Sequence, residues 1–268
     1  MIRALYTAAS GMAAQQNNID VISNNISNVE TPGFKKSNTL FKDTLYDAMD
    51  INRPEPVNLQ VGNGVKVGSL DKSFTQGNIH ETNNPMDIAI QGAGFFKLQS
   101  GDGIIRYTRD GSFKIAPQFT PNGIVQRLVT AEGYYVVDRY TGQPLEFNLP
   151  YQANPNDVVI SQEGFVFIND PNGNAIPIGG IDVVQFANPN ALEDVGGNMY
   201  ALPPQGTELT GEEMQSTSIL KQGYLEGSNV QLFEEMTNLI AAQRAYQLNS
   251  RVLQSADEIE RLANNVRD

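Results

Sequence analysis

Hydrophobic residues near the start of the chain recur at the spacing of an amphipathic helix. Within residues 1–31 one apolar position returns every seven residues, and two further apolar residues lie on its flank. These residues are Leu5, Met12, Ile19 and Ile26, with Ile22 and Val29 on the flank. This period predicts a helix suited to packing against other helices. We expect it to stop at Thr31-Pro32-Gly33, because a proline disfavours helical geometry in the preceding residue and a glycine can turn.

Residues 228–268 carry a second helical pattern, which has a wider apolar face. Two adjacent stripes each recur every seven residues. The first contains Leu232, Leu239, Tyr246 and Leu253, and the second contains Ala245, Val252, Ile259 and Val266. One stripe serves one partner helix, so two adjacent stripes predict several neighbouring helices. Ser228 and Gln231 fit a capping box at the start of this helix.

Between the two ends, short runs of β-branched and aromatic residues alternate with turn residues. All 14 prolines and 23 of the 24 glycines lie within residues 32–227. Because proline and glycine interrupt regular structure, this distribution predicts helical ends around a loop-rich β centre. Asp110-Gly111 and Asn172-Gly173 are typical of β-hairpin turns. Residues 43–65 contain Pro54 and Pro56 and predict an extended arm rather than a packed element.

These patterns predict an α+β fold. N- and C-terminal α-helices are expected to form a coiled-coil-like terminal domain, around a central, mostly antiparallel β domain. The expected boundaries are 1–39 and 225–268 for the terminal helical domain, 40–66 for the extended arm, and 67–224 for the central β domain.

Neither terminal helix can bury its apolar stripes alone, and exposed apolar faces mark association surfaces. We therefore expect an assembly interface built from both helices. Its members are Leu5, Met12, Ile19, Ile22, Ile26, Val29, Leu232, Leu239, Tyr246, Val252, Leu253, Ile259 and Val266. The alternative is that both helices pack onto the central domain as ordinary core.

The net charge of the chain limits the classes of partner that it is expected to bind. It has 268 residues with 30 acidic and 18 basic side chains, a formal net charge of −12. Such an acidic chain is a poor match for nucleic acid or anionic lipid. No stretch approaches the roughly 18 apolar residues of a membrane span. The N-terminus also lacks the apolar region of a cleavable signal peptide. We expect no nucleic acid, no membrane insertion and no cleaved leader.

Residues suited to catalysis or metal binding are sparse. The chain has no cysteine and a single histidine, His80, so thiolate chemistry and a histidine-rich metal site are excluded. Gly92-Ala93-Gly94 lacks the third glycine of a dinucleotide-binding loop. Residues 170–174 lack the final acidic ligand of a calcium loop. Glu234 and Glu235 are expected on solvated helix faces. We expect no enzymatic activity, no cofactor and no metal.

Several segments resemble the signatures of one bacterial family, the flagellar rod and hook proteins. The N-terminal match is Ser23-Asn24-Asn25-Ile26-Ser27-Asn28-Val29-Glu30-Thr31-Pro32-Gly33-Phe34-Lys35. The C-terminal match is Glu234-Glu235-Met236 followed by residues 242–250. The central matches are residues 87–96, residues 107–113 and Gln76-Gly77-Asn78. The resemblance runs from end to end of the chain. The length, and the arm ending at Gly62-Asn63-Gly64-Val65, are most similar to the distal rod members.

The resemblance implies a structural subunit of the distal rod, which polymerises helically into a hollow, torque-transmitting drive shaft. It implies partners among further copies of the chain, other rod and hook subunits and the flagellar export machinery, with the surrounding basal-body ring proteins as further candidates. It implies a location in the flagellar basal body, where the rod spans the periplasm, reached by export without signal-peptide cleavage.

Two other functions are left open by the sequence. The first is a proximal rod or hook subunit of the same axial family, and residues 40–65 are the segment expected to discriminate. The second is a periplasmic or extracellular glycan-binding β domain with coiled-coil ends for oligomerisation. That function requires a groove lined by Tyr134, Tyr135 and Tyr140.

Overall fold

The computed structural model describes residues 2–44, 46–48, 60–120, 123–147, 157–169, 175–203, 208–209 and 218–265. The described chain divides into two compact units. Unit 1 combines residues from Met1–Asn28, Lys36–Ser73 and Val230–Asp268. Unit 2 combines residues from Val29–Lys35 and Phe74–Asn229. Terminal helices and an antiparallel β region confirm the α+β class expected from the sequence.

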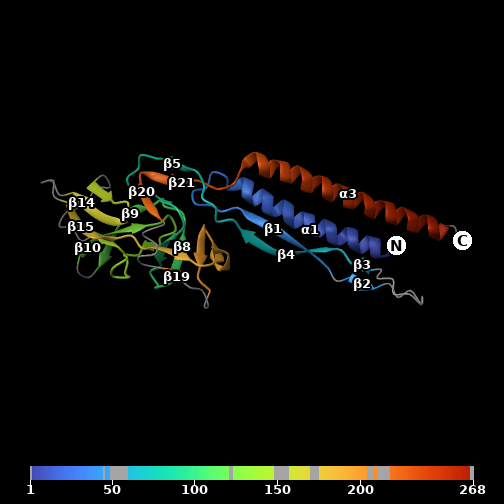
Figure 1. Cartoon of the computed structure of the whole chain (residues 1–268), viewed down its shortest axis with the longest axis horizontal. Coiled ribbons are helices and arrows are strands. Elements are labelled where there is room, and N and C mark those ends of the chain that lie inside the picture. Colours follow the sequence, from blue (N-terminus) through green and yellow to red (C-terminus); the bar gives the residue numbers. More distant parts are fainter. Residues whose placement is uncertain are drawn as a thin grey trace. The chain divides into compact units, whose positions relative to one another are not determined.

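Unit 1 contains the two long helices of the chain. α1 (Ile2–Ser27) has 26 residues and α3 (Leu232–Asn265) has 34. They are about 39 Å and 51 Å long at 1.5 Å per residue. The helices lie side by side and antiparallel, so the start of α1 and the end of α3 lie at the same end of the pair (Figure 1).

The first helix ends earlier than the sequence predicts, at Ser27 instead of near Thr31. The side chain of Asn28 folds back and donates a hydrogen bond to the carbonyl of Asn24 at 3.0 Å, which marks the last helical turn. The turn residue is nevertheless the expected one, because Gly33 has a φ of +68°. A Cβ atom there would also lie 2.6 Å from the backbone nitrogen of Asp110, so only glycine fits.

The second helix begins at Leu232, and the expected capping box at Ser228 is wrong. Backbone hydrogen bonds hold the preceding residues extended instead: Gly227 donates to the carbonyl of Asn78 at 2.8 Å, and Asn229 donates to that of Phe34 at 3.4 Å. The first turn carries Glu234 and Glu235, which suit the partial positive charge of a helix N-terminus.

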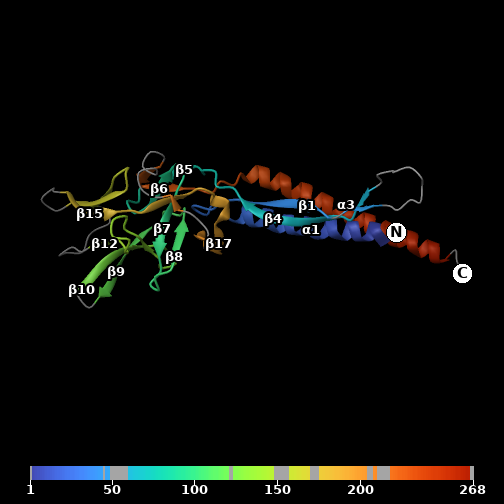
Figure 2. The same ribbon diagram turned by 60° about the horizontal axis from the view of Figure 1, so that its bottom comes forward.

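The segment expected to be an unpacked arm forms part of unit 1. β1 (Ser37–Asp43) and β4 (Val65–Lys72) pair as antiparallel strands and both contact α1 (Figure 2). A shorter pair, β2 (Tyr46–Ala48) and β3 (Gln60–Gly62), continues the segment. Gly64 allows the close approach, because a Cβ there would lie 2.2 Å from Oγ of Ser10 on α1. The expected boundary at residue 67 is also wrong, since β4 runs across it.

Unit 2 is built from antiparallel strands. Its largest sheet runs in the order β12-β10-β11-β7-β8-β18-β17, with β9, β16 and β19 attached beside that path. The bounds are β7 (Phe95–Gln99), β8 (Ile105–Thr108), β9 (Lys114–Thr120), β10 (Gly123–Val129), β11 (Tyr135–Val136), β12 (Glu146–Phe147), β16 (Val183–Phe186), β17 (Glu193–Gly196), β18 (Met199–Ala201) and β19 (Glu208–Leu209), with a short 3-10 helix at Pro189–Ala191.

Three smaller sheets complete unit 2. One contains β13 (Val158–Ile160), β14 (Phe165–Asn169) and β15 (Ala175–Gly180). The other two pair β6 (Ile88–Gln91) with β20 (Ile219–Gln222), and β5 (Ile79–Glu81) with β21 (Tyr224–Glu226). β14 and β15 pair across the expected hairpin, while its turn, residues 170–174, lies outside the described residues.

The Asp110-Gly111 hairpin predicted from the sequence is wrong. β9 pairs with β10 and not with β8, the strand before the turn. Gly111 instead lies against β6, where a Cβ would come within 1.7 Å of the carbonyl oxygen of Ile88. The glycine therefore serves close packing of two backbones rather than a tight hairpin.

Two apolar clusters fill unit 2. The larger one includes Phe96 and Phe113, whose rings meet edge to face at 5.1 Å. The smaller one is mostly aromatic and contains Phe95, Tyr107, Val184, Phe186 and Tyr200. Aromatic side chains bury large apolar areas, so these clusters supply much of the stabilisation of unit 2.

Candidate assembly surfaces

The seam between the two helices follows a seven-residue repeat on α3. Buried or half-buried side chains recur at spacings of three and four residues. They are Glu235, Leu239, Ala242, Ala245, Asn249, Leu253 and Ala256, with half-buried Ser250 beside them. At 3.6 residues per turn these positions share one face, which packs on α1.

The matching face of α1 is centred on Ala8, Ala14, Ile22 and Asn25, all of which are buried. The heptad stripe predicted from the sequence flanks this face, and its side chains are only half-buried. The offset has a structural cause, because α1 contacts β1 and β4 as well as α3. Its buried face is therefore turned toward both neighbours.

Gly11 allows a close approach of α3 along the seam. A Cβ atom at this position would lie 2.9 Å from Nδ2 of Asn249 on α3. A mid-helix glycine costs about 1 kcal/mol relative to alanine. Here the missing side chain makes room for the polar side chain of the opposite helix.

A buried cluster of polar side chains connects α1, β1 and α3 through hydrogen bonds and an ion pair. Nδ2 of Asn25 donates to Oε2 of Glu235 at 3.1 Å and to the carbonyl of Ser37 at 2.9 Å. Lys36 pairs with Oε1 of Glu235 at 3.2 Å. Burial lowers the pKa of Lys36, but hydrogen bonds and charges from Glu235 and Glu234 outweigh it and raise the pKa overall. The expectation that Glu235 is solvated is wrong, since it faces the seam and is 2% exposed.

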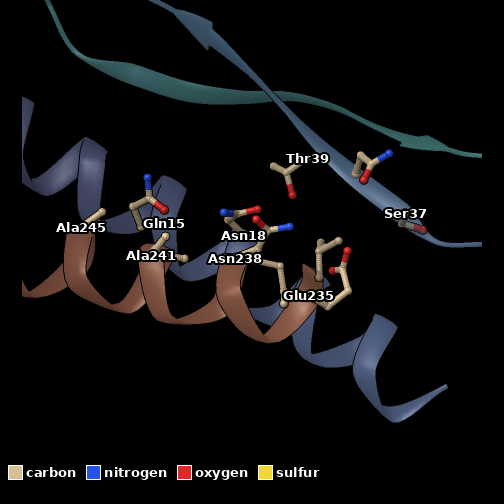
Figure 3. A pocket seen from close by; sticks show the side chains of 12 residues that line it. Gln15, Asn18, Ser37, Thr39, Glu235, Asn238, Ala241 and Ala245 are labelled. Atoms are coloured by element: carbon tan, nitrogen blue, oxygen red, sulfur yellow. The ribbon is translucent and has the colours of Figure 1, made fainter. Parts of the chain in front are cut away.

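A groove of about 410 Å³ opens between α1, α3 and β1. Figure 3 shows Gln15 and Asn18 of α1, Asn238 of α3 and Thr39 of β1 around the same space. The wall from α3 is made mostly of small side chains, among them Ala241 and Ala245 (Figure 3). Oγ1 of Thr39 is buried here without a hydrogen-bond partner among the described residues.

The opposite face of α3 carries a row of exposed apolar side chains, which we call the outer stripe. It consists of Phe233, Met236, Ile240, Leu248, Val252, Ile259 and Leu262. Its centre lies roughly 170° around the helix from the seam. Exposed fractions run from 47% at Met236 to 86% at Phe233. α3 is therefore apolar on both sides, and α1 covers only one of them.

The residues predicted for the assembly interface fall into three groups. Leu5, Met12, Ile19, Ile22, Ile26, Val29, Leu239 and Leu253 are buried or half-buried within the chain. Leu232, Tyr246, Val252 and Ile259 are exposed by 37–53%. Val266 lies outside the described residues. Only Val252 and Ile259 belong to the outer stripe, and their contacts with other copies stay a prediction.

Sequence reasoning missed five members of the outer stripe. Phe233, Met236, Ile240, Leu248 and Leu262 do not share one seven-residue repeat, so they escaped the heptad search. Their spacings of three, four, eight and fourteen residues lie close to multiples of the helical period of 3.6 instead. A search at that period would have found them.

The family-like motifs meet in unit 2 around one carboxylate. Oε1 of Glu226 lies 2.5 Å from Nζ of Lys35 and accepts a hydrogen bond from the backbone nitrogen of Gly77 at 2.9 Å. Oε2 of Glu226 lies 3.2 Å from Nη1 of Arg109. Burial lowers the pKa of Lys35, against the opposing effect of Glu226. These contacts join residues 29–35 to β21, and nothing in the sequence pattern singled out Glu226.

The residues considered for other functions are separated. His80 is exposed on β5, opposite Leu225. Tyr134 packs against the larger apolar cluster, Tyr135 lies under the guanidinium of Arg127, and Tyr140 stacks on a phenylalanine. The three tyrosine rings thus face different neighbours. Among the described residues, no cluster of three potential metal ligands occurs, and no helix is both long and apolar enough to cross a bilayer.

A helix pair that keeps one apolar face exposed is typical of a subunit that associates with others. Three family models match the chain. They are the "Flagella basal body rod protein" at residues 5–35, the "Flagellar hook protein FlgE/F/G D1 domain" at residues 89–168 and the "Flagellar basal body rod FlgEFG protein C-terminal" at residues 221–266.

Curated relatives match along the whole chain. The flagellar basal-body rod protein FlgG of Borreliella burgdorferi is 39% identical, covering 100% of this chain and 99% of its own. FlgG of Buchnera aphidicola (Schizaphis graminum) is 38% identical over 97% of both chains. The hook-basal body complex protein FlhP of Bacillus subtilis is 33% identical over 100% of both. The chain belongs to the flagellar rod and hook protein family, as a structural rod protein and not an enzyme.

Proposed function

We propose that this chain is the subunit of the distal rod, which polymerises helically into a hollow shaft that transmits torque. The observation that carries this proposal is the outer stripe of α3. Burying apolar surface is worth roughly 25 cal/mol per Å², so a long exposed apolar face favours association strongly. Contacts between different faces of neighbouring copies extend into an open helical polymer when they do not close into a ring.

The outer stripe favours coiled-coil-like packing between copies. A neighbouring helix that covers it would leave α3 between two helical partners, one in its own chain and one in the next. Residues inside the α1–α3 seam then support the interface by fixing the orientation of α3. In this arrangement Val252 and Ile259 contact neighbours directly, whereas Ile22, Leu239 and Leu253 hold the pair together.

The proposed surroundings follow from the family. Other rod and hook subunits adjoin the polymer at its ends, and the basal-body ring proteins surround it. The subunit reaches the periplasm through the flagellar export machinery without cleavage of a signal peptide. The names of the relatives support the location in the basal body, since they describe rod and hook-basal body proteins.

A proximal rod or hook subunit is the second candidate. The matching family models are described for FlgE, FlgF and FlgG together, and FlhP matches the full chain length as well. The higher identity to relatives named FlgG favours the distal rod.

Electron microscopy of the purified protein after concentration tests the proposal. Wild-type protein should form tubes of fixed diameter, and Ile240→Asp should abolish them because it places a charge in the outer stripe. Gln243→Asp is the matched control, since Gln243 is exposed on α3 beside the stripe. Tubes from Ile240→Asp equal to those of the wild type would refute the role of the stripe.

A further inference from the structure

Unit 2 contains a cavity of about 230 Å³ that the assembly function does not use. A cavity needs only roughly 10–15 Å³ to hold one water molecule, so this larger space suits a small ligand or a side chain. The lining combines three aromatic rings, two side-chain amides and a guanidinium: Phe74, Phe95, Phe186, Gln76, Gln185 and Arg109. Three of these six residues, Gln76, Phe95 and Arg109, come from the central motifs noted in the sequence.

The cavity adjoins a buried excess of positive charge. Lys35 and Arg109 share the single carboxylate of Glu226, and the three side chains are exposed by 3% or less. Within the described chain, no second carboxylate pairs with either cation. A buried charge without an opposite partner is costly, which makes this place favourable for an anion.

The guanidinium of Arg109 has unused donors. Nη1 donates to Oε2 of Glu226 at 3.2 Å and to the carbonyl of Ile90 at 3.5 Å, and Nη2 donates to the carbonyl of Gly92 at 2.8 Å. Nε is buried without an acceptor in the described residues. Arginine has five N–H donors, and these contacts use three of them. Donors therefore remain along the edge of the guanidinium that contains Nε. Such an edge matches the two oxygens of a carboxylate.

We propose that this cavity binds a carboxylate through the guanidinium of Arg109, which lines it and whose Nε lacks an acceptor among the described residues. One negative charge balances the single excess positive charge of the cluster, so a monoanion is matched better than a phosphate dianion. The guanidinium lies 5.5 Å from the ring centre of Phe95, which fixes its plane. The rings of Phe74 and Phe186 offer apolar contact to the carbon atoms behind the carboxylate. The ligand is a free small acid or an acidic side chain of a second copy.

Titration of the full-length monomer with sodium acetate and sodium butyrate, against sodium chloride at equal ionic strength, tests the site. Saturable NMR shifts of the amides of Ala93 and Gly94 are expected with the carboxylates only. Ala93→Phe should weaken binding about tenfold or more by filling the cavity. Ala93 is exposed and lines the cavity. Ala131→Phe is the control, because Ala131 is exposed on a turn outside the cavity lining.

Arg109→Lys supplies a second variant, which keeps the charge that faces Glu226 but removes Nε. It should bind acetate at least about tenfold more weakly. Absence of saturable shifts in the wild type, or equal affinity in Ala93→Phe, would overturn the proposal. Repeating the titration on polymer identifies the source. Acetate binding lost on assembly indicates a side chain of a second copy, whereas retained binding indicates a free acid.

Discussion

Asn25 and Glu235 form a hydrogen bond of 3.1 Å although 210 positions separate them in the sequence. The side chain of Asn25 also makes two hydrogen bonds to the backbone of Ser37, one donated and one accepted. One buried amide thus connects both long helices to β1. This contact sets the register of the helix pair, because apolar seams alone allow sliding.

Asn25→Ala should destabilise unit 1 by about 1–3 kcal/mol, since it leaves buried polar groups of Glu235 and Ser37 without partners. Chemical denaturation followed by far-ultraviolet circular dichroism measures the change. Asn24→Ala is the control at an exposed neighbouring position, and its effect should stay within about 0.5 kcal/mol. Equal effects of the two substitutions would contradict the role assigned to Asn25.

Lys36 should give unit 1 a stability that is lost in alkali. Its pKa is raised above the ordinary value of 10.5, because Glu235 and Glu234 outweigh the effect of burial. The folded chain therefore holds this proton more tightly than the unfolded chain. The contribution is complete below pH 10.5 and disappears as the pH rises through the folded-state pKa.

The measurement is the difference in unfolding free energy between wild type and Lys36→Met across this pH range. The difference should shrink above pH 10.5. In a Glu235→Gln background it should be small at every pH, because the main partner has lost its charge. If the difference in unfolding free energy grew with pH, the direction assigned to the pKa shift of Lys36 would be wrong.

Alanine substitutions at Gly33 and Gly133 distinguish the cost of backbone strain from the cost of a steric clash. Both have positive φ, at +68° and +87°, so alanine is strained at either position by roughly 1–2 kcal/mol. A Cβ at Gly33 would lie 2.6 Å from the backbone of Asp110, whereas one at Gly133 would meet nothing within 4 Å. Thermal unfolding should therefore show a clearly larger loss for Gly33→Ala. Equal losses of thermal stability in the two variants would contradict a tight contact between Gly33 and Asp110.

Leu239 and Ile240 are adjacent in the chain but lie on different faces of α3. Leu239→Asp should break the α1–α3 pair, lowering the helix signal of the monomer and blocking assembly. Ile19→Asp should behave in the same way from the side of α1. Ile240→Asp should leave the monomer signal intact and block assembly only. Comparing circular dichroism with sedimentation for the three variants distinguishes the seam from the outer stripe.

The distal part of α3 should gain order on assembly. Every side chain from Asp257 to Leu262 is exposed, so this part of the helix has little packing of its own, and most helix stability in proteins comes from packing. We expect residues at both ends of the chain to fray in the monomer. Circular dichroism of monomer and polymer at equal concentration should show more helix in the polymer, and no gain would count against the proposal.

The sequence was sufficient to predict the two long helices and a central region of short strands. The heptad of Leu239 and Leu253 follows directly from the helical period. Gly33 was predicted as a turn residue because its neighbour is a proline. These predictions depend on local spacing, which a single sequence contains.

The errors come from contacts between distant segments. Ser228 resembles a cap, but pairing of its neighbours with other segments delays the helix. Glu235 resembles a surface acid, and only its distance to Asn25 reveals a buried role. Gly111 resembles a hairpin turn, although its function is close approach to Ile88. In each case long-range packing overrides a local preference.

The pairing of α1 with α3 has a consequence for how the chain is made. α1 leaves the ribosome long before α3. At a synthesis rate of roughly 5–20 residues per second, α3 is made on the order of ten to forty seconds after α1. A truncated translation product therefore lacks the partner that closes this pair. Closure of the pair therefore requires that α3 has been synthesised.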